Sequence, residues 1–406
     1  MEDKKLMQIT LGVQSPWFVK SVELNTSEER MEVYFDFIKG SVFACQICNK
    51  PCKTHDTKDR SWRHLPLFHY DSYIHARVPR TKCEVHGTKT VVIPWSRPDT
   101  GFTSLFEADV VALCKEMPVA SVAERVKIHE ESAWRILAYH VNEAIERVDL
   151  SQLDTIGVDE ISVRKGHKYI TLFYDIKNAK VIHIGVGKGK DAIKKFKHTI
   201  SKKINPEQIK YIAMDMSPAF ISGVREYFPS AKIVFDKFHV IHMMNATIDD
   251  VRRKEYKTNK ILSKTRFIWL KNSENLSDKE KKKLHSMKDL DIKTAKAYQF
   301  KLALQRLWLV KDLVAARNYL NTWYYWAAHS KIEEIVKLAE TVHTHSYGIL
   351  EAIRTGLNNS VAEGLNNKIK TVVKRSYGFK TAKYRNTMIY LVAGKLELPS
   401  GLPTQC

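Results

Sequence analysis

Strand-like and helical segments follow one another in a fixed order between residues 155 and 235, and this order limits the possible folds more than any other feature. Three strand-like runs come first, and a helix, a strand, a helix and a strand follow. The predicted strands are Thr155–Val163, Tyr169–Asp175, Val181–Val186, Lys210–Met214 and Ala231–Phe235, and the predicted helices are Asp191–Ile200 and Ser217–Phe228. An antiparallel start followed by parallel crossovers is the order of an RNase H-like α/β core.

The charge of the chain favours a polyanionic partner. Lys and Arg number 66 against 45 Asp and Glu, a formal net charge of +21. Cations that bind a phosphate backbone release its counterions, so nucleic acid is favoured over a merely basic soluble protein. Hydrophobic residues make up 44% of the chain, enough for a sizeable core. The sequence has neither an apolar run of about 18 residues nor an apolar signal core in Met1–Thr10, which argues against a membrane protein and an exported one.

Two cysteine-containing knuckles predict a structural metal site. Cys45-Gln-Ile-Cys48 and Cys83-Glu-Val-His86 have the same x-x spacing, which allows two ligands to converge on one tetrahedral ion. Thiolate and imidazole ligands suit Zn²⁺, and the clustering indicates a metal site in a reducing compartment rather than a disulfide scaffold. Cys52 and His55 are alternative ligands, and ordinary buried cysteines are the simpler alternative. The intervening strands are expected to carry three basic side chains toward DNA, namely Arg77, Arg80 and Lys82.

A pair of short helical patterns follows the metal module. Val119–Lys127 and Ser132–Val141 are joined by a four-residue connection, as in a helix-turn-helix. Ser132 is the expected N-cap of the second helix. That helix is expected to offer three side chains to a groove or to phosphates: Trp134, Arg135 and Tyr139. A plain helical hairpin that links two domains is the alternative.

The pattern changes again after residue 240, where only helical periodicity remains until about residue 350. The sequence therefore predicts a multidomain α+β protein with a zinc finger, a helix-turn-helix and an RNase H-like core interrupted by an all-α insertion. The expected parts are residues 1–100 (zinc module), 101–150 (helix-turn-helix), 151–240 (first part of the core), 241–350 (insertion) and 351–406 (a final core helix and the C-terminus). Tryptophans in the insertion are interpreted as its core.

Three acidic residues fall where an RNase H-like core holds metal ions. Hydrolysis and transfer of phosphodiesters use two ions roughly 3.5–4 Å apart, and Mg²⁺ requires oxygen ligands from distant segments. Asp159 lies within the first strand, Asp215 ends the fourth strand, and Glu363 lies on the helical segment Asn359–Lys374. Each acid alone is more simply an ion-pair or capping residue, but three at these positions predict a catalytic triad.

Four further residues have provisional assignments near this triad. Asn366 and Lys370 follow Glu363 by three and seven residues, on one face of the helix, where they are expected to orient the metal ligands and to hold a phosphate. Asp236 is an alternative second metal ligand, although strand order favours Asp215 beside Asp159. His239 is expected to support the metal ligands or contact substrate. Glu160 should face the other side of the strand and be structural.

These motifs together resemble the ISL-three-type insertion-sequence transposases of the DDE superfamily, over nearly the whole chain. The resemblance rests on the two knuckles, the helix-turn-helix and several segments of the catalytic region. These segments are Gly157-Val-Asp-Glu-Ile161 with Arg164-Lys-Gly-His167, Ala213-Met-Asp-Met-Ser-Pro218, Pro229 through Val234-Phe-Asp-Lys-Phe-His-Val240, and Ala362-Glu-Gly-Leu-Asn-Asn-Lys-Ile-Lys370 with Tyr377-Gly378. One departure is His86, where a fourth cysteine is usual.

The resemblance implies an RNase H-like core interrupted by a helical insertion, with Asp159, Asp215 and Glu363 as the triad and two Mg²⁺ ions as cofactors. Mn²⁺ is expected to substitute. The implied substrate is the terminal inverted repeats of an insertion sequence. Water would nick the transposon end by in-line attack on phosphorus, and the freed 3′-hydroxyl would then attack target DNA.

Two rival functions remain from the sequence alone. One is a catalytically silent DNA-binding protein derived from a transposase, and the other is an RNase H-like nuclease or junction resolvase without strand transfer. Two transposon ends must be held together, so a homodimer or larger synaptic complex is expected. The expected location is the bacterial cytoplasm, associated with the nucleoid.

Overall fold

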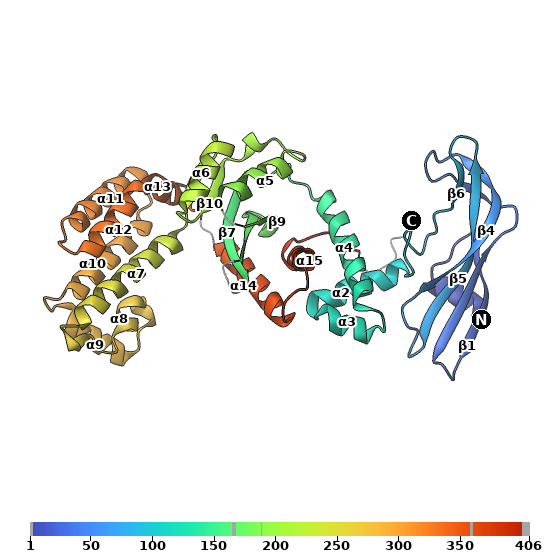
Figure 1. Ribbon diagram of the computed structural model, residues 1–406, viewed down its shortest axis with the longest axis horizontal. Helices are drawn as coiled ribbons and strands as arrows, with labels where there is room; N and C mark the ends of the chain where they lie inside the picture. The colour runs from blue at the N-terminus through green and yellow to red at the C-terminus, as the bar shows by residue number, and fades with distance from the viewer. Residues whose placement is uncertain (1–2, 165–167, 188, 358–359, 400–406) are drawn as a thin grey trace. The chain divides into compact units, whose positions relative to one another are not determined.

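The structure is a computed structural model that describes residues 3–164, 168–187, 189–357 and 360–399. The chain divides into two compact units (Figure 1). The first unit holds the chain up to Arg147, with Arg375–Thr387 and a stretch from Leu396 on. The second unit holds Val148–Lys374 and Met388–Lys395. The described residues from 360 to 399 are therefore divided between the two units.

A six-stranded sheet forms most of the first unit. A short helix, α1 (Asp3–Thr10), precedes it. The strands are β1 (Trp17–Asn25), β2 (Arg30–Phe37), β3 (Val42–Ala44), β4 (Pro51–Arg63), β5 (Asp71–Cys83) and β6 (Gly87–Thr90). Their order is β1-β2-β5-β4-β3, with β6 on β5, and the β2–β5 pair is parallel while the other pairs are antiparallel.

Alternating burial along the strands explains how this sheet forms one apolar core. Met31, Val33 and Phe35 on β2 are buried, while the residues between them are partly exposed. Successive side chains on a strand point to opposite faces, so this alternation places one face against the core. Trp17 and Trp62 both meet Trp95 edge-on within this cluster. The N-terminal module is therefore a sheet with its own core and is larger than an isolated finger.

Three helices complete the first unit: α2 (Ser104–Glu116), α3 (Val119–Arg125) and α4 (Glu130–Arg147). The predicted pair of helices is confirmed, but α4 begins two residues before the expected N-cap Ser132. Arg375 donates hydrogen bonds to the carbonyl oxygens of Lys115 and Glu116, which satisfies the open C-terminal end of α2.

The second unit contains a five-stranded sheet with the order β11-β10-β7-β8-β9. Its strands are β7 (Thr155–Arg164), β8 (Lys168–Asp175), β9 (Lys180–Val186), β10 (Tyr211–Met214) and β11 (Lys232–Phe235). Strands β7, β8 and β9 pair antiparallel, while β10 pairs parallel with both β7 and β11. All five predicted strands are confirmed to within one residue at each end.

Helices lie against both faces of this sheet. On one face, α5 (Lys190–Ile200) and α6 (Pro218–Tyr227) contribute to a cluster with Val158, Phe173 and Met214. On the other face, Ala213 and Val234 pack with Ala352 of α13 (Ser346–Thr355) and Val361 of α14 (Ser360–Arg375). The α14 face is the one that carries Asp159 and Asp215, because they lie two residues after Gly157 and Ala213 and side chains alternate along a strand.

Between β11 and α14 the described chain has helices and short 3-10 turns and no strand, which agrees with the predicted helical composition. The helices are α7 (Lys237–Tyr256), α8 (Arg266–Leu270), α9 (Asp278–Lys288), α10 (Lys293–Arg306), α11 (Leu313–Ala328), α12 (Glu333–Thr344) and α13. Trp269 and Trp323 are fully buried among them. Trp326 is 59% exposed and is not part of that core, contrary to the prediction.

A final helix, α15 (Ala382–Ala393), was missed by the sequence reasoning, which ended the helices with the Glu363-bearing segment. Met388, Ile389 and Leu391 on α15 are buried.

Among the described helices, none is both long and apolar enough to cross a membrane.

Candidate active site and DNA-recognition module

Asp159 and Asp215 are brought to the same edge of the second-unit sheet by a parallel strand pair. Gly157 on β7 pairs with Ala213 on β10, and each acid follows its paired residue by two positions. Both side chains are partly buried. Carboxyl ends of parallel strands commonly form the binding edge of an α/β sheet, and the sheet presents two acids at this edge.

The carboxylate of Asp159 is held by two hydrogen bonds. Its Oδ1 accepts from the backbone N–H of Glu160 at 2.7 Å, and its Oδ2 accepts from Nδ2 of Asn366 at 2.6 Å. Burial raises the pKa of Asp159, and the nearby charge of Asp215 raises it further. The Glu160 amide, the charge of His239 and the Asn366 amide oppose this rise. A cation at this edge would offset the cost of keeping the carboxylate ionised.

Helix α14 packs against the second-unit sheet (Figure 1). Its residue Asn366 reaches Asp159 through a hydrogen bond. Asn366 is buried, together with Ala362 and Ile369 on the same side of the helix. Oδ1 of Asn366 accepts a hydrogen bond from the hydroxyl of Tyr174, a fully buried residue on β8. The sequence predicted Asn366 as a residue near the triad but did not predict Tyr174, because a tyrosine within an apolar strand is typical of a packing residue.

Glu363 and Lys370 lie beside this buried face of α14 and are exposed. They are seven residues apart, two helical turns, so they share one stripe of the helix. Among the described residues, the acids of the predicted triad do not converge into a three-ligand cluster of the kind that the finger forms. The structure therefore brings Asp159 and Asp215 together and leaves Glu363 at the edge of the same face.

Asp236 and His239 follow β11, the strand on the far side of β10 from β7. The Asp236 carboxylate accepts from the backbone N–H of Phe238 at 3.2 Å and is the N-cap of α7. Asp215 makes a similar local bond, from the N–H of Ser217 at 3.0 Å. Both acids therefore accept a local backbone hydrogen bond, but only Asp215 directly follows β10, the strand that pairs with the Asp159-bearing β7.

Four side chains in the first unit converge as metal ligands: Cys45, Cys48, Cys83 and His86. Their ligand atoms all lie within 4.8 Å of one another, and Cys48 Sγ to Cys83 Sγ, Cys45 Sγ to His86 Nδ1 and Cys83 Sγ to His86 Nδ1 are each 3.7 Å. Tetrahedral ligands about 2.3 Å from a zinc ion are about 3.8 Å apart, so the spacing fits Zn²⁺. Backbone N–H groups of His86 and Val85 lower the pKa of Cys83 to about 7, which favours the ligating thiolate.

The alternative ligands Cys52 and His55 are outside this group of four. Cys52 is buried against the cluster, and its Sγ donates to the carbonyl oxygen of Lys50 at 3.4 Å. Cys45 accepts the backbone N–H of Asn49 through its own carbonyl, which closes the first knuckle. Cys52 therefore supports the cluster by packing.

Comparison with known proteins decides the family. A transposase family model matches residues 156–389, more than half of the chain. The chain belongs to the ISL3 family of transposases. The helix-turn-helix domain of transposase family ISL3 matches residues 91–141, and the zinc-finger of transposase IS204/IS1001/IS1096/IS1165 matches residues 42–86. The predicted zinc finger, helix-turn-helix and DNA transposase activity are thereby confirmed.

Whole-length relatives agree with this family. The transposase for insertion sequence element IS1001 of Bordetella parapertussis is 27% identical over 394 residues, which are 95% of this chain and 97% of that protein. The transposase for insertion sequence element IS1557 of Mycobacterium tuberculosis is 24% identical over 436 residues, with 98% of both chains covered. The similarity therefore includes the finger, the helix-turn-helix and the catalytic unit.

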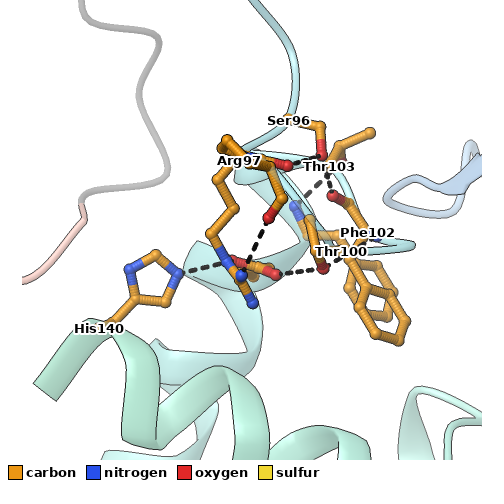
Figure 2. Close-up of polar contacts among 9 residues, drawn as sticks. Ser96, Arg97, Thr100, Phe102, Thr103 and His140 are labelled. Carbon is orange, nitrogen blue, oxygen red and sulfur yellow. Dashed lines mark hydrogen bonds and ion pairs between the residues drawn. The ribbon is translucent and has the colours of Figure 1, made fainter. Parts of the chain in front are cut away.

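The helix-turn-helix of the transposase is held by a buried carboxylate. Glu107 on α2 is 0% exposed and accepts hydrogen bonds from Arg97 Nε at 2.8 Å, Thr100 Oγ1 at 2.7 Å and His140 Nε2 at 2.7 Å. Figure 2 shows these three side chains converging from the segment before α2 and from α4. Arg97 also lies over the ring of Tyr139, 4.0 Å from its centroid. One carboxylate thus joins the loop, α2 and the recognition helix.

Trp134 is placed differently from the prediction. Its ring is buried and stacks on Tyr384 with centroids 4.2 Å apart and planes at 2°, and its Nε1 donates to Glu130. A ring covered in this way is not offered to a DNA groove, so Trp134 is a packing residue. Arg135 is exposed and Tyr139 is 39% exposed, and both stay candidates for DNA contact.

Two of the three predicted basic side chains on the sheet form ion pairs with aspartates. Arg77 forms hydrogen bonds to both carboxylate oxygens of Asp36, at 2.8 and 3.0 Å. Arg80 is paired with Asp56, and Lys82 is exposed. Arg77 and Arg80 keep about half of their side-chain surface accessible, at 53% and 44%. The Arg164–His167 motif lies largely outside the described residues.

Proposed function

We propose that this transposase binds the terminal inverted repeats of an insertion sequence and cleaves and rejoins DNA at a site built from Asp159, Asp215 and Glu363. The observation that carries the proposal is the parallel pairing of β7 with β10, which sets Asp159 beside Asp215. Helix α14 adds Glu363 from the same sheet face, because its neighbour Asn366 is bonded to Asp159.

We further propose that the second-unit sheet is an RNase H-like core and that residues from about 241 to 350 are an insertion into it. Support comes from the order of three antiparallel strands followed by two parallel ones. The helices α7 to α13 come between the last strand and the Glu363-bearing helix. A core of this kind gathers its acids at the carboxyl edge of the sheet, which is where Asp159 and Asp215 lie.

Divalent magnesium, which Mn²⁺ can replace, fits the donor set at this edge. Both carboxylates supply hard oxygen donors, and each Asp159 oxygen keeps a lone pair beyond its one hydrogen bond. Glu363 is exposed, so its side chain has rotamer freedom to turn toward the two aspartates. When bound, such ions activate the attacking hydroxyl and stabilise the leaving oxygen.

Other side chains near the acids would orient the metal ligands and hold the DNA. Asn366 and the Glu160 amide fix the Asp159 carboxylate, and His239 contributes positive charge near it when protonated. Lys370, exposed on the same stripe as Glu363, is suited to hold a phosphate without reading sequence. Asp236 supports this site by starting α7 rather than by binding metal.

The first unit is proposed to recognise the transposon end. A structural Zn²⁺ would stabilise the sheet, held by the four ligands Cys45, Cys48, Cys83 and His86. Exposed Arg135 and Tyr139 on α4, with Arg77 and Arg80 on β5, would contact DNA. Since two ends must be held together, a homodimer or larger synaptic complex is proposed, acting on DNA of the bacterial nucleoid in the cytoplasm.

The test is cleavage of a labelled transposon-end duplex in Mg²⁺ by Asp215→Asn and Asp236→Asn. We expect Asp215→Asn to lose several orders of magnitude in rate and Asp236→Asn to keep measurable activity. Asp312→Asn is the matched control, since Asp312 is likewise an N-cap, accepting from the N–H of Ala315 at 2.7 Å on α11. A dead Asp236→Asn variant with an active Asp215→Asn variant would reverse the assignment of the second ligand.

A strand-transfer assay separates the rival functions. A wild-type protein that nicks ends but never joins them to target DNA is a nuclease or resolvase. A wild-type protein that binds ends but does not nick them, whether Mg²⁺ or Mn²⁺ is present, is a catalytically silent DNA-binding protein. The presence of all three acids and the arrangement of Asp159 and Asp215 favour the transposase with full activity.

A further inference from the structure

A relay of two hydrogen bonds runs from β8 through α14 to the first catalytic acid. The Tyr174 hydroxyl donates to Oδ1 of Asn366, and Nδ2 of Asn366 donates to Oδ2 of Asp159. The three residues come from sequence positions far apart, so only the folded second unit assembles the relay. Tyr174 is 0% exposed and Asn366 is 5% exposed.

The amide of Asn366 has two ends with opposite hydrogen-bonding properties. Its NH₂ group donates and its oxygen accepts. An ionised Asp159 only accepts, so a flipped amide would set oxygen against oxygen. The Tyr174 hydroxyl is the donor that satisfies the amide oxygen in the productive orientation. Without this hydroxyl, the amide oxygen would be buried without its partner, which favours other side-chain orientations.

The ring and the hydroxyl of Tyr174 have different surroundings. Gly157 is its cross-strand partner on β7, and Gly157 carries no side chain that would occupy the space over the strand. Burial raises the pKa of Tyr174, so the phenol stays protonated and available as a donor at neutral pH. The ring serves the core, while the hydroxyl points to a polar partner beside the acidic edge.

We propose that Tyr174 is a positioning residue for DNA cleavage, acting through Asn366 to hold the Asp159 carboxylate in the orientation that binds the divalent ion. This inference rests on the proposed function of the Asp159 edge. Partners of metal ligands typically change metal affinity or activity by 10- to 100-fold when removed. Tyr174 does not touch DNA or metal in this account.

The first test is Tyr174→Phe in the full-length protein with its zinc in place. We expect the Mg²⁺ concentration for half-maximal cleavage to rise by roughly 10-fold in a protein that still unfolds cooperatively and binds transposon ends without metal as the wild type does. The unfolding midpoint should fall only as far as the loss of one buried hydrogen bond requires. Direct Mn²⁺ binding measured by calorimetry should weaken by a similar factor. Tyr319→Phe is the matched control, because Tyr319 donates to the carbonyl oxygen of Ala303 at 2.8 Å on a different pair of helices.

A double-mutant cycle tests whether Tyr174 acts through Asn366. Asn366→Ala alone should weaken Mn²⁺ binding at least as much as Tyr174→Phe, and the double variant should be no worse than Asn366→Ala. Additive losses would overturn the proposal, as would unchanged metal dependence in a folded Tyr174→Phe protein. If the wild type binds Mn²⁺ but never cleaves, the cycle still decides the relay, while the transposase proposal fails by itself.

Discussion

Glu107 on α2 accepts a 2.7 Å hydrogen bond from His140 on α4, and this bond ties the two helices on either side of α3. Burial alone would raise the pKa of Glu107, but the bonds from His140, Arg97 and Thr100 lower it below its usual value. An acid with a lowered folded-state pKa stabilises the fold above its unfolded pKa and loses that effect as pH falls through the folded pKa.

Glu107→Gln should therefore destabilise the first unit by about 1–3 kcal/mol at pH 7. The difference from wild type should shrink as pH falls below the ordinary glutamate pKa of about 4.3 and disappear once pH has passed through the lower folded-state pKa of Glu107. Urea unfolding at pH 7 and at acidic pH measures this difference in stability. Glu143→Gln, at an exposed position on α4, is the control and should match wild type. An equal difference at both pH values would show that ionisation of Glu107 does not contribute.

Removal of zinc should unfold the finger end of the sheet. Cys48→Ser is expected to lose bound zinc and to lower the unfolding temperature of the first unit, because a closed four-ligand site contributes directly to folding. Cys52→Ser should retain one zinc per chain, measured by atomic absorption, since Cys52 is outside the ligand group. Retention of zinc by Cys48→Ser and loss by Cys52→Ser would mean that Cys52 is a ligand.

Trp134 and Arg135 are neighbours on α4 with opposite expected effects. Trp134→Ala should destabilise the first unit by about 3–5 kcal/mol, because it removes a buried ring that stacks on Tyr384. Arg135→Ala should leave stability within about 0.5 kcal/mol and weaken binding to the transposon end. Chemical unfolding and end binding at two salt concentrations separate the two effects. Unchanged binding by Arg135→Ala would remove it from the DNA interface.

A buried lysine holds a short helix in the helical region. Nζ of Lys301 donates to the carbonyl oxygens of Trp269, Leu270 and Lys271, at 3.0, 2.7 and 3.2 Å, at the C-terminal end of α8. Lys301→Met keeps the side-chain volume but leaves these oxygens unpaired, so a loss of roughly 2–3 kcal/mol is expected in urea unfolding. Lys296→Met, on the same helix but 58% exposed, should be nearly neutral.

Local patterns predicted the secondary structure well where burial repeats with a clear period. The strand Val181–Val186 was predicted, and β9 starts one residue earlier at Lys180. Helix α15 was missed although its residues Met388, Ile389 and Leu391 are buried, since apolar residues in its second half are nearly continuous and show little one-sided pattern. Periodicity detects a helix with one apolar face and fails for one covered on several sides.

Residue type and spacing were sufficient to name the ligands of the finger and the three candidate acids. A Cys-x-x-Cys or Cys-x-x-His knuckle sets its own geometry over four residues, so chain distance is a guide to spatial distance. Trp134 shows the limit of this reasoning. A tryptophan on a recognition helix is equally consistent with DNA contact and with packing, and only the presence of Tyr384, 250 positions later, decided for packing.

By itself, the sequence determined the finger, the helix-turn-helix, the order of strands and helices along the chain and the three candidate acids, because these depend on spacing and on the chemistry of single residues. Only the tertiary structure showed that β10, which Asp215 follows, pairs with the Asp159-bearing β7, and that Tyr174 reaches Asp159 through Asn366. These relationships depend on strand pairing and on the packing of α14 across the sheet. Such contacts join residues too far apart in the chain for any local pattern to record.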